Sequence, residues 1–146
     1  MIDITSLKEP TVIEGNIAFD DRGSVKFVNS FDPGWFKRFY IVENHRQGFI
    51  RAWHGHKIET KGVLVLKGAA LVGAVPIDIN ATPKVFTLSA SKPCVLIIPS
   101  GYCNGFKSLT EDCQIMFFST TTIEEAKGDD YRFPYDQWNC WEEDYR

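Results

Sequence analysis

The sequence predicts a single all-β domain of the sandwich or barrel type, and three observations support this. Short runs of β-branched and aromatic residues, separated by turn signals, recur along most of the 146-residue chain. The eleven Phe, five Tyr and four Trp suit a packed β-core or a pocket that stacks on a ring. The length falls within the roughly 100–200 residues of one domain, and neither a linker nor a repeat is visible, so we expect one domain over residues 1–146.

The predicted elements follow in chain order. Residues 16–30 read as a β-hairpin with its turn at residues 20–23, and residues 38–44 read as a strand. The apolar run at residues 62–75 is broken at Lys67-Gly68, which predicts a second hairpin. Further strands are expected within the ranges 84–90, 94–101 and 113–122. The one helical pattern is a short turn after Thr122, with Glu125 placed for a capping box and Gly128 placed to end it.

Charge and cysteine usage exclude several classes of function. The net charge is -3, and no cluster of Lys or Arg forms a basic stripe, so we expect neither a nucleic-acid nor a membrane partner. No apolar stretch approaches the ~20 residues of a membrane span, and the first ten residues lack the apolar core of an export signal. The four cysteines form no C-x-x-C pair, which favours free thiols in the cytoplasm.

One stretch carries a pattern of chemical interest. Gly48 is followed by five residues, the pair His54 and His56, four residues, Lys61, six residues and Gly68. Two histidines at positions i and i+2 of a strand face the same side. The spacing resembles the first motif of the cupins, G-x5-H-x-H-x(3,4)-E-x6-G, with Lys61 in the glutamate position. This resemblance implies a jelly-roll fold.

The second cupin motif, P-x-G-x2-H-x3-N, resembles the segment 99–108, where Asn104 takes the histidine position and Ser108 the final asparagine position. A protonated lysine has no lone pair to offer a metal, and a carboxamide is a weak ligand. We therefore predict a site without metal or cofactor. The alternative is a zinc site built from His54, His56 and Cys103, because imidazole and thiolate suit zinc.

A closer resemblance covers residues 20 to about 120. The dTDP-4-dehydrorhamnose 3,5-epimerase family carries a D-x-R-G turn, a G-V-L-R-G-L-H strand, a K-L-V-R-V-L-R-G strand and a P-x-G-F-A-H-G-F loop. The present chain has DDRG at 20–23, GFIRAWH at 48–54, KGVLVLKG at 61–68 and PSGYCNGF at 99–106, in the same order. The segment RAWHGHK also resembles the R-G-x-H-A-H-K motif of the related nucleotide-sugar 3,4-ketoisomerases.

This resemblance implies that His54 removes a proton next to a sugar ketone, with His56 as the alternative base. It also implies that Arg22 and Arg51 bind the diphosphate and that Lys61 lies near the sugar. Substrate contacts are further expected from Tyr102 and Asn104. The chemistry agrees, because proton abstraction next to a carbonyl needs a base near neutrality and a positive group for the enolate oxygen.

The departures from the family pattern narrow the predicted reaction. Asn104 replaces a histidine, and the position of the family's tyrosine acid falls near Ile123 or Glu124. Two family aspartates are replaced by Val72 and Pro76, so that an aspartate to orient the histidine must come from the tail, as Asp129, Asp130 or Asp136. The double-epimerase machinery is thus incomplete, and the departures favour a reaction with one proton abstraction, such as a single epimerisation or a ketoisomerisation.

The predicted function is an epimerase or ketoisomerase acting on a nucleotide-diphosphate-linked keto-deoxysugar by metal-free proton abstraction, in a homodimer as is usual in this family. The alternative is a cupin that binds a nucleotide sugar without turning it over. Single residues also have simpler interpretations. His54 and His56 could be hydrogen-bonded core residues, and Cys103 could be a packed side chain. The aromatic, acidic tail could wall the pocket, cover an edge of the barrel or form a dimer contact.

Overall fold

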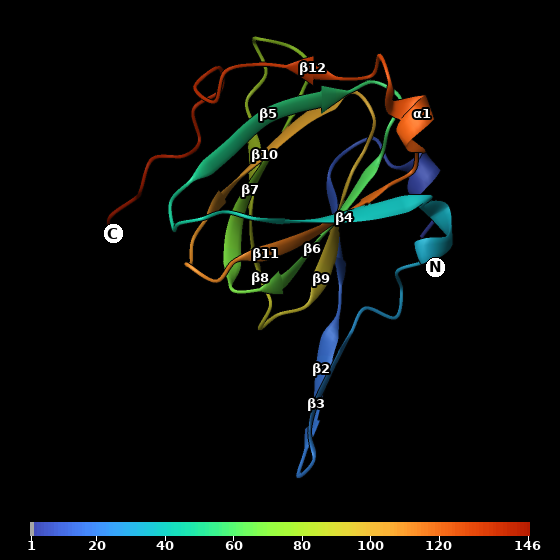
Figure 1. Cartoon of the computed structure of the whole chain (residues 1–146), viewed down its shortest axis with the longest axis vertical. Helices are drawn as coiled ribbons and strands as arrows, with labels where there is room; N and C mark the ends of the chain where they lie inside the picture. Colours follow the sequence, from blue (N-terminus) through green and yellow to red (C-terminus); the bar gives the residue numbers. More distant parts are fainter. Residues whose placement is uncertain (1) are drawn as a thin grey trace.

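The computed structural model describes residues 2–146 as two five-stranded antiparallel sheets packed face to face, with a long hairpin extending from them (Figure 1). The first sheet has the order β1-β9-β6-β11-β4, with strands Thr11–Glu14, Cys94–Ile98, Lys61–Lys67, Gln114–Ser119 and Arg38–Glu43. The second has the order β12-β5-β10-β7-β8, with strands Tyr131–Arg132, Ile50–His56, Tyr102–Ser108, Ala69–Pro76 and Lys84–Ser89. The predicted all-β jelly-roll fold is confirmed.

The space between the sheets is apolar at one end and polar at the other. Because strand side chains alternate between faces, Lys61 lies on the same face of β6 as the buried Val63 and Val65. On β11, Ser119 similarly shares a face with Phe117 and Ile115. Each of these strands therefore runs from the hydrophobic core into a polar region, and that region holds the site described below.

The hairpin predicted within residues 62–75 is wrong. β6 pairs with β9 and β11, whereas β7 pairs with β8 and β10. The chain therefore crosses from one sheet to the other at Lys67-Gly68. Gly68 makes this crossing with φ +69, where an added Cβ would lie 2.0 Å from the Thr110 hydroxyl oxygen. Both segments are apolar on both faces, and such runs do not specify their pairing partners.

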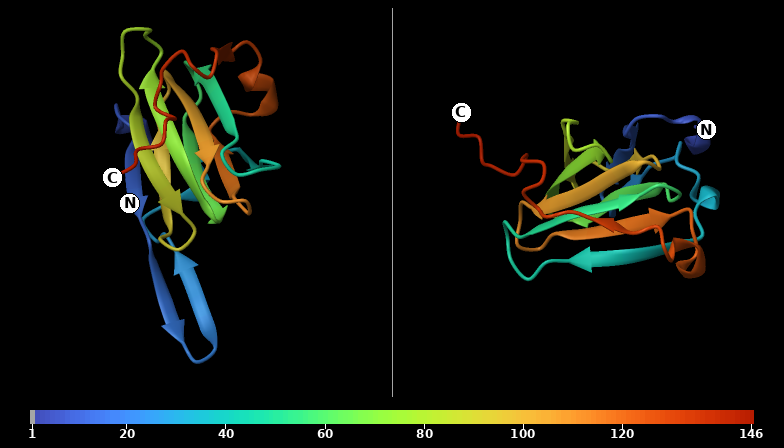
Figure 2. Two further views of the ribbon diagram at one scale, coloured as in Figure 1. Left: turned by 90° about the vertical axis from the view of Figure 1, so that its left-hand side faces the viewer. Right: turned by 90° about the horizontal axis from the view of Figure 1, so that it is seen from above.

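The hairpin predicted near the N-terminus is present as strands β2 (Asn16–Asp20) and β3 (Gly23–Phe27), joined at the expected turn. Figures 1 and 2 show it reaching well beyond both sheets. We call residues 16–27 the arm. Its Phe19 side chain is 83% exposed and Val25 is 64% exposed. Large apolar side chains at such exposure leave the arm without a hydrophobic partner in the single chain.

The short helix α1 (Ile123–Ala126) has the predicted capping box between Thr122 and Glu125. After β12, the tail crosses the outer face of the second sheet, where Trp138 and Trp141 pack on Trp53. Two single turns of 3-10 helix, Ile4–Ser6 and Pro33–Trp35, complete the described elements. No helix within residues 2–146 is long and apolar enough to cross a membrane.

Candidate active site

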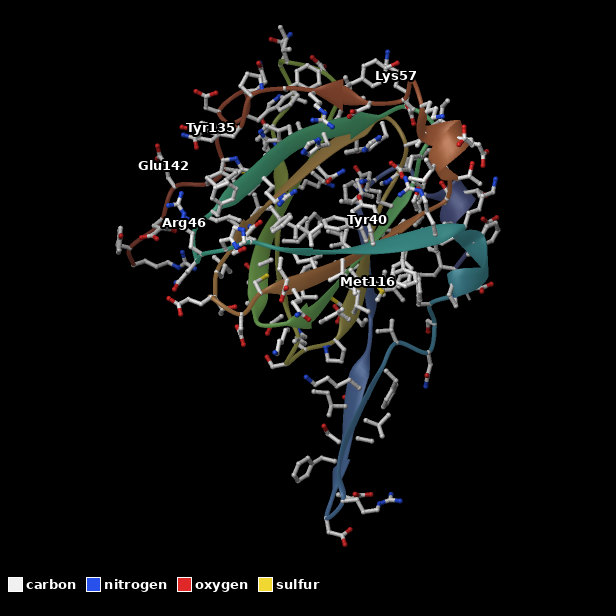
Figure 3. The ribbon with its side chains drawn as sticks, in the orientation of Figure 1. Tyr40, Arg46, Lys57, Met116, Tyr135 and Glu142 are labelled. Atoms are coloured by element: carbon white, nitrogen blue, oxygen red, sulfur yellow. The ribbon has the colours of Figure 1, made fainter. Side chains whose placement is uncertain are left out.

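A cavity of about 760 Å³ opens at the polar end of the space between the sheets. Both sheets contribute to it, and helix α1 and strand β12 form part of its wall. Its polar and charged lining residues are Arg38, Tyr40, Arg51, His54, His56, Glu59, Lys61, Asn104, Asp130 and Arg132. Figure 3 labels Tyr40 on β4, below β5. Of the predicted site residues, the structure thus brings together Arg51, His54, His56, Lys61 and Asn104.

An irregularity in strand pairing aligns the residues of β5. Asn104 pairs with His54 but Phe106 pairs with Arg51, so two residues of β5 oppose one of β10 between them. Strict alternation would turn Arg51 and His54 to opposite faces, since they are three positions apart. The bulge offsets the alternation by one residue, and Arg51 joins both histidines at the cavity.

His54 has the features of a free base. Its side chain is only partly buried, and its ring makes no hydrogen bond to any residue between 2 and 146. Burial lowers the pKa of His54, and the positive charges of Arg132 and Lys61 lower it further, while Asp130 acts in the opposite sense. The imidazole is therefore neutral at pH 7 and able to accept a proton.

His56 is held more tightly. Its Nδ1 lies 2.7 Å from the carbonyl oxygen of Asp129 and 3.1 Å from Oε2 of Glu59. Because a carbonyl oxygen only accepts, Nδ1 carries the proton. The other ring nitrogen, Nε2, is buried and has no partner among the described residues. His56 is thus fixed in orientation, whereas His54 is left free to meet a ligand.

Lys61 forms a close pair with Tyr40. The ammonium is almost fully buried, with 6% of the residue exposed, and donates to the Tyr40 hydroxyl oxygen at 2.5 Å. It also lies 5.1 Å and 5.3 Å from the ring centroids of Tyr40 and Phe117, which stack on each other. A phenol bound to an ammonium is well suited to give a proton to a developing oxyanion.

Glu59, another residue of the cavity wall, places a carboxylate beside Arg38, His56 and Lys61. Only 2% of the residue is exposed, and its carboxylate accepts from Arg38 at 3.1 Å. The Lys61 ammonium lies 3.9 Å away, and the Ser119 hydroxyl donates to the same carboxylate. Arg38 is held from its other side by the Thr121 carbonyl oxygen at 3.0 Å. These partners satisfy the polar atoms of a carboxylate that is almost entirely removed from water.

The cavity has an excess of positive charge although the chain is acidic. Four cations line it, namely Arg38, Arg51, Lys61 and Arg132, against two carboxylates, Glu59 and Asp130, a difference of two. Within residues 2–146, Arg51 has no ion-pair partner. An unpaired guanidinium at a cavity suits a bidentate anion such as a phosphate.

The three aspartates proposed to orient the histidine have different positions. Asp129 is buried, and its carboxylate accepts from the backbone amides of the three residues that follow His56, at 2.7–3.1 Å. Asp130 lines the cavity, acts electrostatically on His54 and forms an ion pair with Arg132 at 3.0 Å. Asp136 is exposed in the tail and does not line the cavity. Asp130 is therefore the aspartate placed to act on His54.

Two predicted substrate contacts lie outside the cavity lining. Arg22 is at the tip of the arm, where its side chain is 86% exposed and pairs with Asp20. Tyr102 donates from its hydroxyl to the carbonyl oxygen of Lys8 at 3.3 Å and does not line the cavity. Asn104 lines the cavity from strand β10, not from a loop as expected, and donates to the carbonyl oxygen of His54 at 3.3 Å.

Of the two positions where the family's tyrosine acid was expected, Ile123 lines the cavity and Glu124 does not. Four polar or charged lining residues were missed from the sequence: Arg38, Tyr40, Glu59 and Arg132. For Arg38 and Tyr40 the sequence does carry a signal. Along residues 38–43 these two side chains share one strand face with the apolar Val42, which indicates that they face inward. Glu59 and Arg132 have no comparable signal, because they lie outside the regular part of any long strand.

The geometry excludes the zinc site that would include Cys103. This residue pairs with Gly55 on β5, so it faces away from both histidines and packs with Trp53 on the outer side of the sheet. Burial raises the pKa of the Cys103 thiol to about 12, as befits a packed side chain. No group of three or more His, Cys, Asp or Glu within residues 2–146 is arranged to hold a metal ion. Activity without a metal stays a prediction.

A jelly roll with a polar, histidine-lined cavity between its sheets defines the cupin class. The family model of dTDP-4-dehydrorhamnose 3,5-epimerase matches residues 4–135, and the chain belongs to this family. A curated relative, the dTDP-4-dehydrorhamnose 3,5-epimerase of Neisseria gonorrhoeae, is 29% identical over an alignment of 130 residues that covers 80% of this chain. The match spans only 39% of that relative's length.

Solved structures share the fold. The dTDP-4-dehydrorhamnose 3,5-epimerase of Elizabethkingia anophelis NUHP1 superposes with a TM-score of 0.77 at 20% identity, over 96% of this chain and 85% of that one. A double mutant of the 3,4-ketoisomerase of Thermoanaerobacterium thermosaccharolyticum, in complex with TDP, superposes with a TM-score of 0.68 at 21% identity. That match covers 89% of this chain and 91% of the ketoisomerase.

Proposed function

We propose that this protein is an isomerase of a nucleotide-diphosphate-linked keto-deoxysugar, acting as an epimerase or a ketoisomerase by proton abstraction next to the ketone. The observation that carries the proposal is the arrangement of His54 and the Lys61–Tyr40 pair. A neutral imidazole, free of hydrogen bonds within the described chain, lies on one sheet, and a phenol bound to a buried ammonium lies on the other, at the same cavity.

In this reaction, the neutral ring of His54 takes the proton from the carbon next to the ketone. The C–H bonding electrons move toward the ketone oxygen, where the Lys61 ammonium and the Tyr40 hydroxyl stabilise the negative charge. Return of a proton to the opposite face of the same carbon gives the epimer. For the ketoisomer, the Tyr40 hydroxyl gives its proton to the former ketone oxygen and takes one back from the hydroxyl on the deprotonated carbon. His54 then returns its proton to the former ketone carbon, so that every proton is accounted for.

Arg51 supports binding of the diphosphate, since it is the cavity guanidinium without an ion-pair partner among the described residues. A dianionic diphosphate would be attracted by the net positive charge of the cavity. The ketoisomerase among the structural neighbours is in complex with TDP, so thymidine diphosphate sugars are the first ligands to offer.

A homodimer would give Arg22 a role that it lacks in one chain. The arm has exposed Phe19 and Val25, and the edge strand β4 has exposed Phe39 and Ile41. An unpaired edge with apolar side chains favours pairing with another strand. We therefore propose that the arm of a second copy lies along β4 and brings Arg22 to the cavity, because Arg38 and Tyr40 of β4 line it.

Deuterium uptake tests the function. The native protein is incubated in deuterium oxide with dTDP-, UDP- and GDP-linked 4-keto-6-deoxysugars, and the position of the label is read by NMR. Uptake next to the ketone supports the proposal and separates epimerisation from ketoisomerisation. Binding of a nucleotide sugar without any uptake would identify a non-catalytic binding protein instead.

The four free thiols favour a reducing compartment, and we propose that the protein is cytoplasmic.

A further inference from the structure

From the geometry we infer that Glu59 is a positioning residue of the reaction, a buried carboxylate that holds Lys61, Arg38 and His56 in place for the chemical step. The inference rests on the proposed function for its kinetic consequence, but its structural consequence is separate. The cupin-like motif gave no role to this position, since the glutamate of that motif aligns with Lys61.

The contacts of Glu59 divide between its two oxygens. Oε1 accepts from Arg38 at 3.1 Å and from the hydroxyl of Ser119. Oε2 lies 3.1 Å from Nδ1 of His56 and 3.9 Å from Nζ of Lys61. The side chain is 1% exposed, so these groups leave little access for a ligand. Although Glu59 belongs to the cavity wall, its carboxylate is covered by these groups, so it acts through its neighbours.

The neighbours distinguish this carboxylate from one that only stabilises the fold. Arg38, His56 and Lys61 all line the cavity, and they come from three different strands. Long lysine and arginine side chains have many rotamers, and a shared buried anion restricts them. With Glu59 in place, the Lys61 ammonium is directed to the Tyr40 hydroxyl before substrate binds, which is the preorganisation that oxyanion stabilisation requires.

The contacts also predict which kinetic parameter depends on Glu59. Arg51, the guanidinium proposed to bind the diphosphate, makes no contact with Glu59. Loss of the carboxylate should therefore lower kcat while KM stays within about twofold, because ground-state binding of the nucleotide is preserved. Residues that orient the ligands of metal sites typically change activity by about 10–100-fold, and by analogy a decrease in kcat of this size is expected for Glu59→Gln.

The first experiment needs no substrate. In isotope-labelled protein, the ¹⁵N signals of the Lys61 ammonium and the His56 ring should move in Glu59→Gln, which keeps the shape but removes the charge. The matched control is Glu43→Gln, an exposed glutamate on β4 that should leave both signals unchanged. Unmoved Lys61 and His56 signals in a folded Glu59→Gln protein would overturn the inference.

The second experiment measures kcat, KM and the pH profile of Glu59→Gln, of Glu43→Gln and of Glu59→Asp. The Glu59→Asp variant keeps the carboxylate and should therefore have a higher kcat than Glu59→Gln. A rise in KM that accounts for the whole loss of kcat/KM, with kcat unchanged, would contradict a positioning role.

If Glu59→Gln does not fold, Ser119→Ala removes one hydrogen bond to the carboxylate without changing any charge, and smaller shifts of the Lys61 signal and of kcat are expected. Unchanged values in that variant count against the inference. A native protein that exchanges no proton refutes the proposed function alone, and the NMR signals still decide whether Glu59 positions its neighbours.

Discussion

The Lys61 ammonium donates a hydrogen bond to the Tyr40 hydroxyl oxygen at 2.5 Å, and both residues line the same cavity as His54, from the opposite sheet of the jelly roll. Tyr40 stands on β4 and Lys61 on β6, with β11 between them, so the pair exists only when these three strands are in register. The chain thus has a phenol in its cavity, although neither Ile123 nor Glu124, the positions expected for the family's tyrosine, carries one.

Replacing Tyr40 with Phe removes the acid and leaves the ring that stacks on Phe117. We expect kcat for deuterium exchange to fall by ~10²–10⁴-fold, the range supplied by general acid–base catalysis, while nucleotide affinity is retained. The matched control is Tyr135→Phe, an exposed tail residue outside this cavity, which should behave as the native protein does. Full activity of the Tyr40 variant would assign the acid elsewhere.

The two histidines are expected to differ in their effects. His54→Asn removes the free base, so exchange should fall by ~10²–10⁴-fold with little change in ligand affinity by calorimetry. His56→Asn removes a ring held by Asp129 and Glu59, and it should retain measurable exchange. The reverse result would make His56 the base, as the ketoisomerase motif allows, and the isomerase function would stand.

The lowered pKa of His54 predicts the pH dependence of kcat/KM. Because the base must be unprotonated, activity is present above this pKa and is lost as the pH falls through it, which places the acid limb below the ordinary value of 6.5. Arg132 contributes to the lowering by its charge. In Arg132→Gln, the pKa of His54 should rise and the acid limb should move to higher pH. An acid limb that does not move would exclude His54 as the group observed.

Arg51→Ala should weaken binding of TDP by about 1.5–3 kcal/mol, the usual range for a hydrogen bond to a charged group. Calorimetry with TDP measures this directly. Arg46→Ala is the control, because Arg46 is an exposed arginine outside the cavity, packed over Phe49. Equal affinities of the Arg51 variant and the native protein would remove Arg51 from the diphosphate site.

Mixing variants tests whether the arm of one copy completes the site of another. Arg22→Ala and Arg51→Ala should each be impaired alone. If Arg22 acts in the partner's cavity, a mixed dimer contains one site with both arginines, so reassociated mixtures should recover up to about a quarter of the native activity. No recovery, or a monomer in sedimentation experiments, would contradict the exchange of arms.

Much of the fold was accessible from local patterns. The turn at residues 20–23, the capping box of α1 and most strands of the two sheets were predictable, because each depends on residues close together in the chain. The pairing of β6 and β7 was not. Their sequences are apolar on both faces, so nothing local distinguishes a hairpin from a crossing between sheets.

The sequence by itself determined the family, the fold class and a shared face for His54 and His56, because motif spacing and the two-residue period of a strand are local properties. Only the tertiary structure decided the rest of the site. The bulge that turns Arg51 inward, the register that brings Tyr40 to Lys61, and the burial of Glu59 beneath three cavity residues all depend on contacts between distant strands. Such contacts depend on sheet pairing and on the space between the sheets, and neither is encoded in a single stretch of sequence.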